Sequence, residues 1–210
     1  MILHDFGPAA NGQRVRMFLA EKGLDIKTAE LNVRDGAQYE EPYNSMNPFH
    51  CVPFLELDDG TVIAESVSIC RYLEELHPEP SLFGRDAVER GVIDMWNRRV
   101  ELDGFMPVLH AVRNHVPLFA GRVVPGTRTD LEQEPAIVER GKSMMKIFLA
   151  RLDPQLAKNP FIAGDRFSIA DITGHFALRA TGLLEMDIEG EFPNVFRWQG
   201  EVAARPSVPS

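Results

Sequence analysis

The spacing of hydrophobic residues changes repeatedly over the first 77 positions, which indicates short strands alternating with helices. Alternating apolar and polar residues predict four strands, at Ile2–Phe6, Ile26–Val33, Phe54–Leu57 and Thr61–Ala64. Helical spacing predicts one helix between Gln13 and Gly23 and another beginning at Ser66 and ending before Pro78. Asp58-Asp59-Gly60 is a turn that joins the last two strands as a hairpin.

These elements, with a short irregular helix over 35–47, follow the order strand, helix, strand, helix, hairpin, helix. That is the order of a thioredoxin-like α/β domain with a mixed four-stranded sheet. Helical spacing dominates the remainder, over 86–115, 131–152, 168–184 and 193–204. Pro78 and Pro80 oppose helix between the two parts, and Pro107 predicts a kink within the first long helix. We therefore expect a thioredoxin-like domain over 1–77, a linker over 78–85 and an all-α domain over 86–210.

Composition and charge exclude several classes of function. The chain carries 31 acidic and 22 basic residues, a net charge of −9, which repels nucleic acid. It contains no apolar run long enough to span a membrane, and its first residues lack the features of a signal peptide. Cys51 and Cys70 form no close-spaced pair, and the six histidines show no metal-binding pattern. We expect a cytoplasmic protein without a metal, a nucleic-acid partner or a membrane partner.

Two dipeptides beside the predicted hairpin can bind a peptide-like ligand. A cis Val52-Pro53 bond would turn the Val52 peptide groups outward, where they can pair with an extended ligand, although trans is the commoner form. Ser66 begins a helix, whose N-terminus attracts a carboxylate, and Glu65 can pair with an ammonium group. Together they satisfy both charges of an α-amino acid. The simpler alternative makes Ser66 only a helix cap.

Two longer motifs identify a family. The segment N-P-F-H-C-V-P-F-L-E-L-D-D-G-T-V-I-A-E-S-V-S-I-C-R-Y-L, residues 47–73, resembles the glutathione site of cytosolic glutathione transferases. The segment F-I-A-G-D-R-F-S-I-A-D-I-T, residues 161–173, resembles the capping box of that family's helical domain, with Ser168 as the cap and Asp171 as its partner. The resemblance covers nearly the whole chain.

The resemblance implies a role for each residue of the glutathione site. It makes Val52 the backbone partner of the cysteinyl part, Pro53 the cis-proline, and Glu65 and Ser66 the anchors of the γ-glutamyl group. Gln38 falls in the loop that holds the glycine carboxylate in many members, and a solvated loop residue is its equal alternative. Acidic residues stand beside it, at Glu40 and Glu41, where basic residues are common in the family.

The usual catalytic side chain is missing from the segment that precedes the first helix. Phe6-Gly7-Pro8-Ala9-Ala10-Asn11-Gly12 contains no Tyr, Ser or Cys. The helix N-terminus and the Asn11 amide remain as groups that can stabilise a thiolate, with a plain turn residue as the alternative for Asn11. A fungal and bacterial subgroup of the family lacks these side chains, and three segments resemble it: Arg14–Lys22, Leu55–Thr61 and Gly91–Leu102. In that subgroup, polar residues on the long fourth helix hold a water, and this sequence has Leu109 and Arg113 at the aligned positions. His110, Arg113 and Asn114 can still share one face, with merely solvated residues as the alternative.

The resemblance implies an enzyme of detoxification that joins glutathione, as co-substrate, to a small electrophile. The electrophile pocket is expected between Pro8 and the helix end formed by Met106, His110, Arg113 and Asn114, and the protein is expected to be a homodimer. Two alternatives remain from the residues: a glutathione-dependent disulfide reductase and a non-catalytic ligand-binding protein of the same fold. Glutathione-affinity chromatography followed by parallel assays with an aryl halide and a small disulfide separates the three.

Overall fold

The computed structural model describes residues 1–209, which form two compact units. The first unit comprises 1–80 with 125–127 and Pro209, and the second comprises 81–124 and 128–208. The break after Pro80 falls inside the segment for which the two prolines predict a linker. Each unit has its own buried apolar side chains, and each is described separately below.

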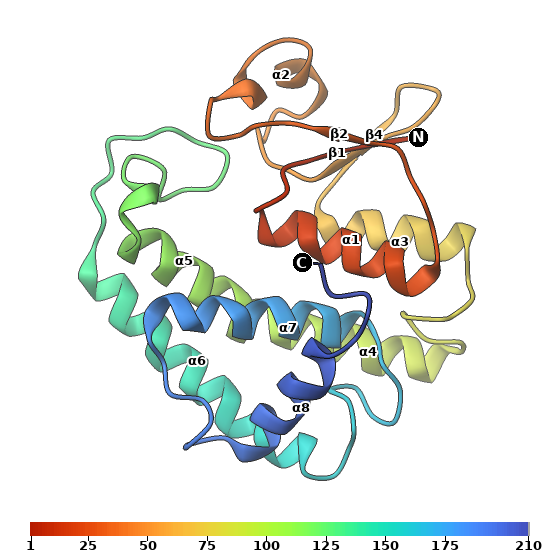
Figure 1. Cartoon of the computed structure of the whole chain (residues 1–210), viewed down its shortest axis with the longest axis vertical. Coiled ribbons are helices and arrows are strands. Elements are labelled where there is room, and N and C mark those ends of the chain that lie inside the picture. The colour runs from red at the N-terminus through yellow and green to blue at the C-terminus, as the bar shows by residue number, and fades with distance from the viewer. Residues whose placement is uncertain (210) are drawn as a thin grey trace. The chain divides into compact units, whose positions relative to one another are not determined.

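The first unit contains a four-stranded mixed sheet, as predicted from the order of elements (Figure 1). Its strands are β1 (Ile2–Asp5), β2 (Thr28–Glu30), β3 (Phe54–Glu56) and β4 (Val62–Ala64), in the order β2-β1-β3-β4. β1 runs parallel to β2 and antiparallel to β3, and β3 pairs with β4 as the predicted hairpin. Helices α1 (Ala10–Lys22) and α3 (Ser66–Leu76) pack side by side, and 3₁₀ helix η1 (Ala37–Tyr39) and α2 (Tyr43–Met46) follow β2.

Helix α1 begins three residues earlier than its apolar spacing predicts. Ala10, Asn11 and Gly12, which the sequence interpretation placed in a turn, form its first turn. Their small or polar side chains carry no helical hydrophobic pattern, so only the tertiary structure shows that these three residues are helical. Gly23 ends the helix in the left-handed conformation with φ 64°, as predicted.

The second unit consists of helices, as predicted for the C-terminal part. The first predicted helix forms α4 (Ala87–Arg99) and α5 (Met106–His115), joined without a break by a π-helical turn, η2 (Val100–Phe105). Pro107 is the second residue of α5, two positions after this turn, where a proline that lacks an N–H group disturbs regular α-helical bonding. The remaining helical elements are η3 (Pro117–Phe119), α6 (Pro135–Leu156), α7 (Ile169–Thr181), η4 (Gly182–Leu184) and α8 (Pro193–Ala203).

Helix α6 starts four residues later than predicted. The Glu134 side chain accepts a hydrogen bond from Ala136 N, and Pro135 occupies the first helical position, where a missing N–H has no cost. The helix also continues to Leu156, past the predicted end at Leu152, because Leu152 and Leu156 both bury their side chains. Its boundaries are therefore set by capping and burial at each end.

The carboxylate of Asp171 is the polar centre of the second unit. Its Oδ1 accepts from Ile162 N and Trp198 Nε1, both at 2.9 Å, and its Oδ2 accepts from Ser168 N at 3.0 Å. The predicted capping box of Ser168 and Asp171 is thereby confirmed. Burial raises the pKa of Asp171 to about 6, although its hydrogen bonds act in the opposite direction. One side chain thus ties the start of α7 to α8 and to the loop before α7.

His175 lies fully inside the second unit on α7. Its side chain is 1% exposed, and neither ring nitrogen has a hydrogen-bond partner among residues 1–209. Phe176 packs edge-on against the ring. Burial, together with the nearby Arg179 charge, lowers the pKa of His175 from 6.5 to about 4. The imidazole is therefore neutral in the folded protein at neutral pH.

We predict that His175 makes the protein less stable as the pH falls from 6.5 to 4. In that range the unfolded chain binds a proton that the folded chain rejects, so the free energy of unfolding decreases with acidity, by about 2 to 3 kcal/mol for this group. Urea unfolding of the wild type and His175→Leu at several pH values isolates the effect. The leucine variant should lose less stability, whereas the exposed control His115→Gln should follow the wild type. If the free energy of unfolding depends on pH in the same way for His175→Leu and the wild type, the lowered pKa of His175 is not the cause.

Candidate functional site

Three segments of the first unit meet at one edge of its sheet. His4 of β1 pairs with Phe54 of β3, and Phe54 also pairs with Ala64 of β4. The antiparallel register therefore brings together the residues that follow His4, precede Phe54 and follow Ala64. These are the turn before α1, the Val52-Pro53 dipeptide and the Glu65-Ser66 dipeptide. The sheet thus unites the candidate residues that the sequence placed far apart.

The Val52-Pro53 peptide bond is cis, as the resemblance implies. The Val52 N–H and C=O groups make no backbone hydrogen bond within residues 1–209. Asn47 shapes the loop in front of them, since its Nδ2 donates to Cys51 O at 2.8 Å and its Oδ1 accepts from Phe49 N at 3.2 Å. A strand-like pair of peptide groups is therefore available to an extended ligand.

Glu65 has the strained backbone of this site. Its φ of 67° and ψ of 119° are rare for a residue with a side chain, and such strain concentrates at binding and catalytic sites. Ser66 is the first residue of α3 rather than its cap, so the simpler interpretation of Ser66 as a cap is wrong. Among the side chains of residues 1–209, none caps α3 and none caps α1, where Ala9 holds the cap position. Both helices present the N–H groups of their first turns.

Buried hydrogen bonds join the starts of α1 and α3. Arg14 is 2% exposed, and its Nη1 donates to Ser66 Oγ at 2.9 Å. Ser66 is 5% exposed, and its hydroxyl donates to Asn11 Oδ1 at 3.5 Å. Because a guanidinium can only donate, Ser66 Oγ must accept from it, which leaves the hydroxyl proton for another acceptor. The donor direction therefore runs from Arg14 through Ser66 toward Asn11.

Arg14 was not predicted from the sequence as a residue of this site. Its position gives a signal, since Arg14 precedes Phe18 by four residues and so shares the buried face of α1 with it. A charged residue on an apolar helix face needs a buried partner, and here that partner is Ser66. Pattern alone does not name the partner because the two residues are 52 positions apart.

Gln38 is a buried residue of η1. It is 8% exposed, its Nε2 donates to Val33 O at 3.4 Å, and its Oε1 has no hydrogen-bond partner in the part of the chain that the structure describes. The alternative of a solvated loop glutamine is therefore wrong. Its contact with a ligand stays a prediction.

The residues predicted for an electrophile pocket belong to both units. Pro8 lies in the first unit, and Met106, His110, Arg113 and Asn114 lie on α5 in the second. Arg113 Nη1 donates to Arg122 O at 2.5 Å, and Asn114 bonds to His110 O and Glu134 N, each at 2.9 Å. Arg113 and Asn114 therefore hold the segments that follow α5, and the pocket itself stays a prediction.

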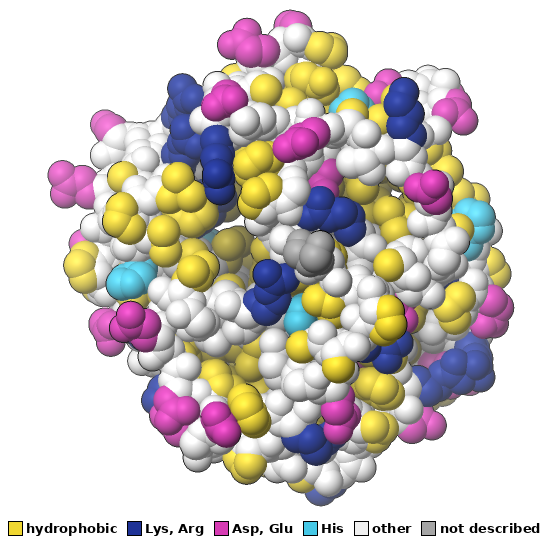
Figure 2. Space-filling model, viewed as in Figure 1, with side chains coloured by type: hydrophobic (Ala, Val, Ile, Leu, Met, Phe, Trp, Pro, Cys, Tyr) yellow, Lys and Arg dark blue, Asp and Glu magenta, His cyan; other side chains and the backbone are white. Residues whose placement is uncertain are grey.

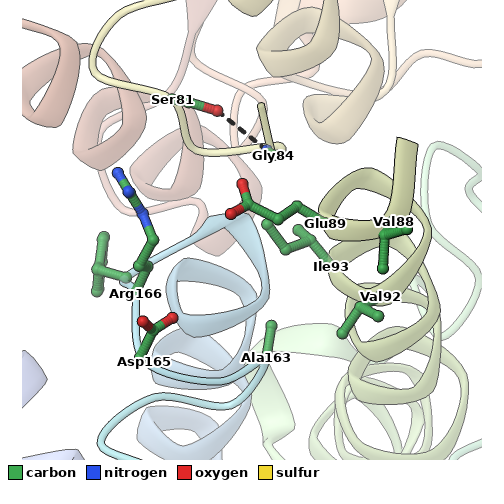
Figure 3. Close-up of a pocket in the computed structure, with 10 residues that line it drawn as sticks. Ser81, Gly84, Val88, Glu89, Val92, Ile93, Ala163, Asp165 and Arg166 are labelled. Atoms are coloured by element: carbon green, nitrogen blue, oxygen red, sulfur yellow. Dashed lines mark hydrogen bonds between the residues drawn. The ribbon is translucent and has the colours of Figure 1, made fainter. Parts of the chain in front are cut away.

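A small pocket of about 150 Å³ lies within the second unit (Figure 3). Val88, Val92 and Ile93 of α4 form its apolar wall, and Glu89, Asp165 and Arg166 add charged groups. Residues predicted to bind glutathione or an electrophile are absent from its lining, so it is distinct from the candidate site.

Cysteine and surface charge add little further chemistry. Burial raises the pKa of Cys70 to about 12, so this thiol stays protonated, and Cys51 is half-buried and forms no disulfide within residues 1–209. Asp and Glu side chains are spread over the face in Figure 2 rather than gathered in one patch. Within residues 1–209, no helix is both long and apolar enough to cross a membrane.

Comparison with known proteins identifies relatives of both units. Residues 10–76 match the glutathione S-transferase N-terminal domain, and residues 116–206 match the glutathione S-transferase C-terminal domain. Glutathione S-transferase 2 of Saccharomyces cerevisiae is 31% identical over 214 residues, covering 99% of this chain and 88% of the yeast protein.

Solved structures extend the similarity to the fold of the whole chain. A glutathione S-transferase domain-containing protein of Marinobacter aquaeolei VT8 is 36% identical, with a TM-score of 0.87 over 99% of this chain and 100% of that one. Gtt2 of Saccharomyces cerevisiae is 31% identical, with a TM-score of 0.88 over 99% and 98% of the two chains.

Proposed function

Because this chain belongs to the glutathione S-transferase family, we propose that its first unit binds glutathione and that the thiolate attacks a small electrophile. The observation that carries this proposal is the convergence of α1, α3 and the Val52 peptide at one edge of the sheet. A glutathione molecule has a peptide, an α-amino acid head and a thiol, and the site offers a partner for each. We further propose that the enzyme acts in the detoxification of electrophiles in the cytoplasm.

The two ends of glutathione need different partners. The γ-glutamyl carboxylate would bind the Ser66 hydroxyl and the N–H groups that open α3, while Glu65 would pair with the ammonium group. The cysteinyl peptide would form two strand-like hydrogen bonds with Val52 next to Pro53. Gln38 is our candidate for the glycine end.

Thiolate formation would depend on the start of α1. Asn11 lies in the first turn of α1, and its amide Nδ2 is the donor that we propose for the thiol; in the ligand-free chain its Oδ1 accepts from the Ser66 hydroxyl. A helix N-terminus stabilises a partly buried anion by up to about 2 kcal/mol, or somewhat more than one pKa unit. A larger reduction of the thiol pKa needs a further donor, and Asn11 is the one that we propose.

The electrophile would be held by Pro8 of the first unit and by Met106, His110, Arg113 and Asn114 of the second. Met106 is 37% exposed and offers an adaptable apolar surface. The backbone contacts of Arg113 and Asn114 make them shaping residues, which leaves His110 as the side chain free to approach a substrate.

A homodimer is the proposed assembly. Val88, Val92 and Met95 are exposed by 75%, 37% and 51%, and their spacing places them on one face of α4. Leu102 of η2 continues the exposed apolar series. A second copy of the chain is a suitable partner because a two-fold axis pairs such a face with itself.

We predict that Ser66→Ala and Glu65→Gln each weaken glutathione binding by about 1 to 3 kcal/mol, the usual effect of losing a hydrogen bond to a charged group. Titration calorimetry measures the affinity, and thermal unfolding checks that each variant is folded. Ser68→Ala and Glu75→Gln, at exposed positions of the same helix, are matched controls that should bind like the wild type. Wild-type affinity in both site variants would refute the proposed glutathione site.

We predict that Asn11→Ala raises the pKa of bound glutathione while its affinity at low pH stays nearly unchanged. The alanine lacks the amide donor, so the thiolate is less stable but the peptide contacts persist. Ultraviolet thiolate absorbance against pH measures the effect. Asn11→Asp, which can still accept from Ser66 but adds a negative charge, should raise the pKa further. A titration of Asn11→Ala that overlays the wild type would make Asn11 only a helical residue.

We predict a molar mass in solution of twice the 23.6 kDa chain, measured by light scattering at micromolar concentration. Val88→Glu combined with Met95→Glu should shift the mass toward that of one chain, because charges then face an apolar surface. Ile147→Glu, at an exposed apolar position on α6, is the matched control and should leave the mass unchanged. A monomeric wild type would refute the proposal.

A further inference from the structure

The Asp5 carboxylate lies buried against the first turn of α1. Asp5 ends β1 and is 1% exposed. A Cβ atom at Gly12 would lie 1.8 Å from Asp5 Oδ1 and 2.8 Å from Oδ2, so only glycine fits at this helical position. The sequence thus combines two locally unfavourable choices, a buried carboxylate and a glycine inside a helix. Such choices concentrate at functional sites.

Arg16 connects this carboxylate to the turn that precedes α1. Its Nη1 lies 3.1 Å from Asp5 Oδ2, and its Nη2 donates to Gly7 O. Gln13 Nε2 donates to the same carbonyl at 3.3 Å, and the turn is closed by a 2.8 Å bond from Ala9 N to Phe6 O. The Arg16 guanidinium therefore contacts both the Phe6–Ala9 turn and the Asp5 carboxylate.

The charge of Asp5 matters because of its position. An anion beside the first turn of a helix interacts favourably with the helix, but it opposes a second anion that binds there. Burial raises the pKa of Asp5 and the Arg16 charge lowers it, while Glu30 on β2 raises it further. Arg34 lies 5.5 Å from the centre of the Phe6 ring, and Arg14 is a buried cation on the same helix as Arg16, where its Nη1 donates to Ser66 Oγ.

We propose that Asp5 and Arg16 are positioning residues for the glutathione thiolate. Arg16 fixes the Gly7 carbonyl, and with it the turn that leads to the α1 amides. It also neutralises Asp5, so that these amides act on the thiolate without an opposing negative charge. The proposal rests on the proposed function and extends it to two residues that need not touch glutathione.

The test compares the thiol pKa of bound glutathione in Arg16→Met, Asp5→Asn and the double variant. Arg16→Met leaves the Asp5 charge unbalanced and should raise the pKa by about one unit, a tenfold loss of thiolate below the pKa. Asp5→Asn leaves Arg16 unbalanced and should lower the pKa. The double variant should return toward the wild type. Glu30→Gln removes an exposed acidic charge on β2 and should cause the smallest shift.

The opposite signs separate this role from a structural one. If the pair only maintains the fold, Asp5→Asn raises the thiol pKa or leaves it unchanged. The double variant then has a thiol pKa equal to or higher than that of Arg16→Met. Either result overturns the proposal. Asp5→Asn preserves the shape of the side chain and decides the matter if Arg16→Met does not fold. Calorimetry with S-methylglutathione, which has no thiol, checks the binding site itself. Failure of the wild type to bind it would overturn the proposed function and this inference together, whereas normal binding with identical thiol titrations would overturn this inference alone.

Discussion

One buried cation, Arg14, joins the starts of two helices in the first unit. Arg14 has only donors, so its hydrogen bond fixes Ser66 Oγ as an acceptor and determines where the Ser66 proton goes. That proton reaches Asn11 in the ligand-free chain. In the proposed binding mode, a ligand carboxylate would compete for the same proton, which would couple the carboxylate end of the site to the thiol end through a single hydroxyl group.

Locally unfavourable features collect at this edge of the sheet and are stabilised by the surrounding structure. Glu65 has a strained backbone, Gly12 weakens the helix in which it lies, and Asp5 buries a carboxylate. The sheet register holds the three segments together, and Arg16 supplies the charge that Asp5 needs. Within residues 1–209, the N-termini of α1 and α3 have no side-chain caps, so their N–H groups are available to an anionic ligand.

The second unit uses buried polarity in a different way. Asp171 accepts hydrogen bonds from three separate segments, and these contacts fix the start of α7 and the position of α8. His175, one turn later on the same helix, remains neutral because burial and the nearby Arg179 charge lower its pKa. One buried group therefore provides stability through its hydrogen bonds, whereas the other makes that stability sensitive to acid.

The sequence by itself determined the element order, the two-part organisation, the hairpin, the Ser168 capping box and the family, because these follow from local spacing and from motifs of adjacent residues. It also supplied Val52, Glu65 and Ser66 as candidates. Only the tertiary structure decided the helical state of Asn11, the burial of Gln38 and the partners of Arg14, Asp5 and Arg16. Arg14 meets Ser66 across 52 positions, and Asp5 at the end of β1 meets Gly12 in the first turn of α1. These contacts depend on sheet register and helix packing, and no local period in the chain records them.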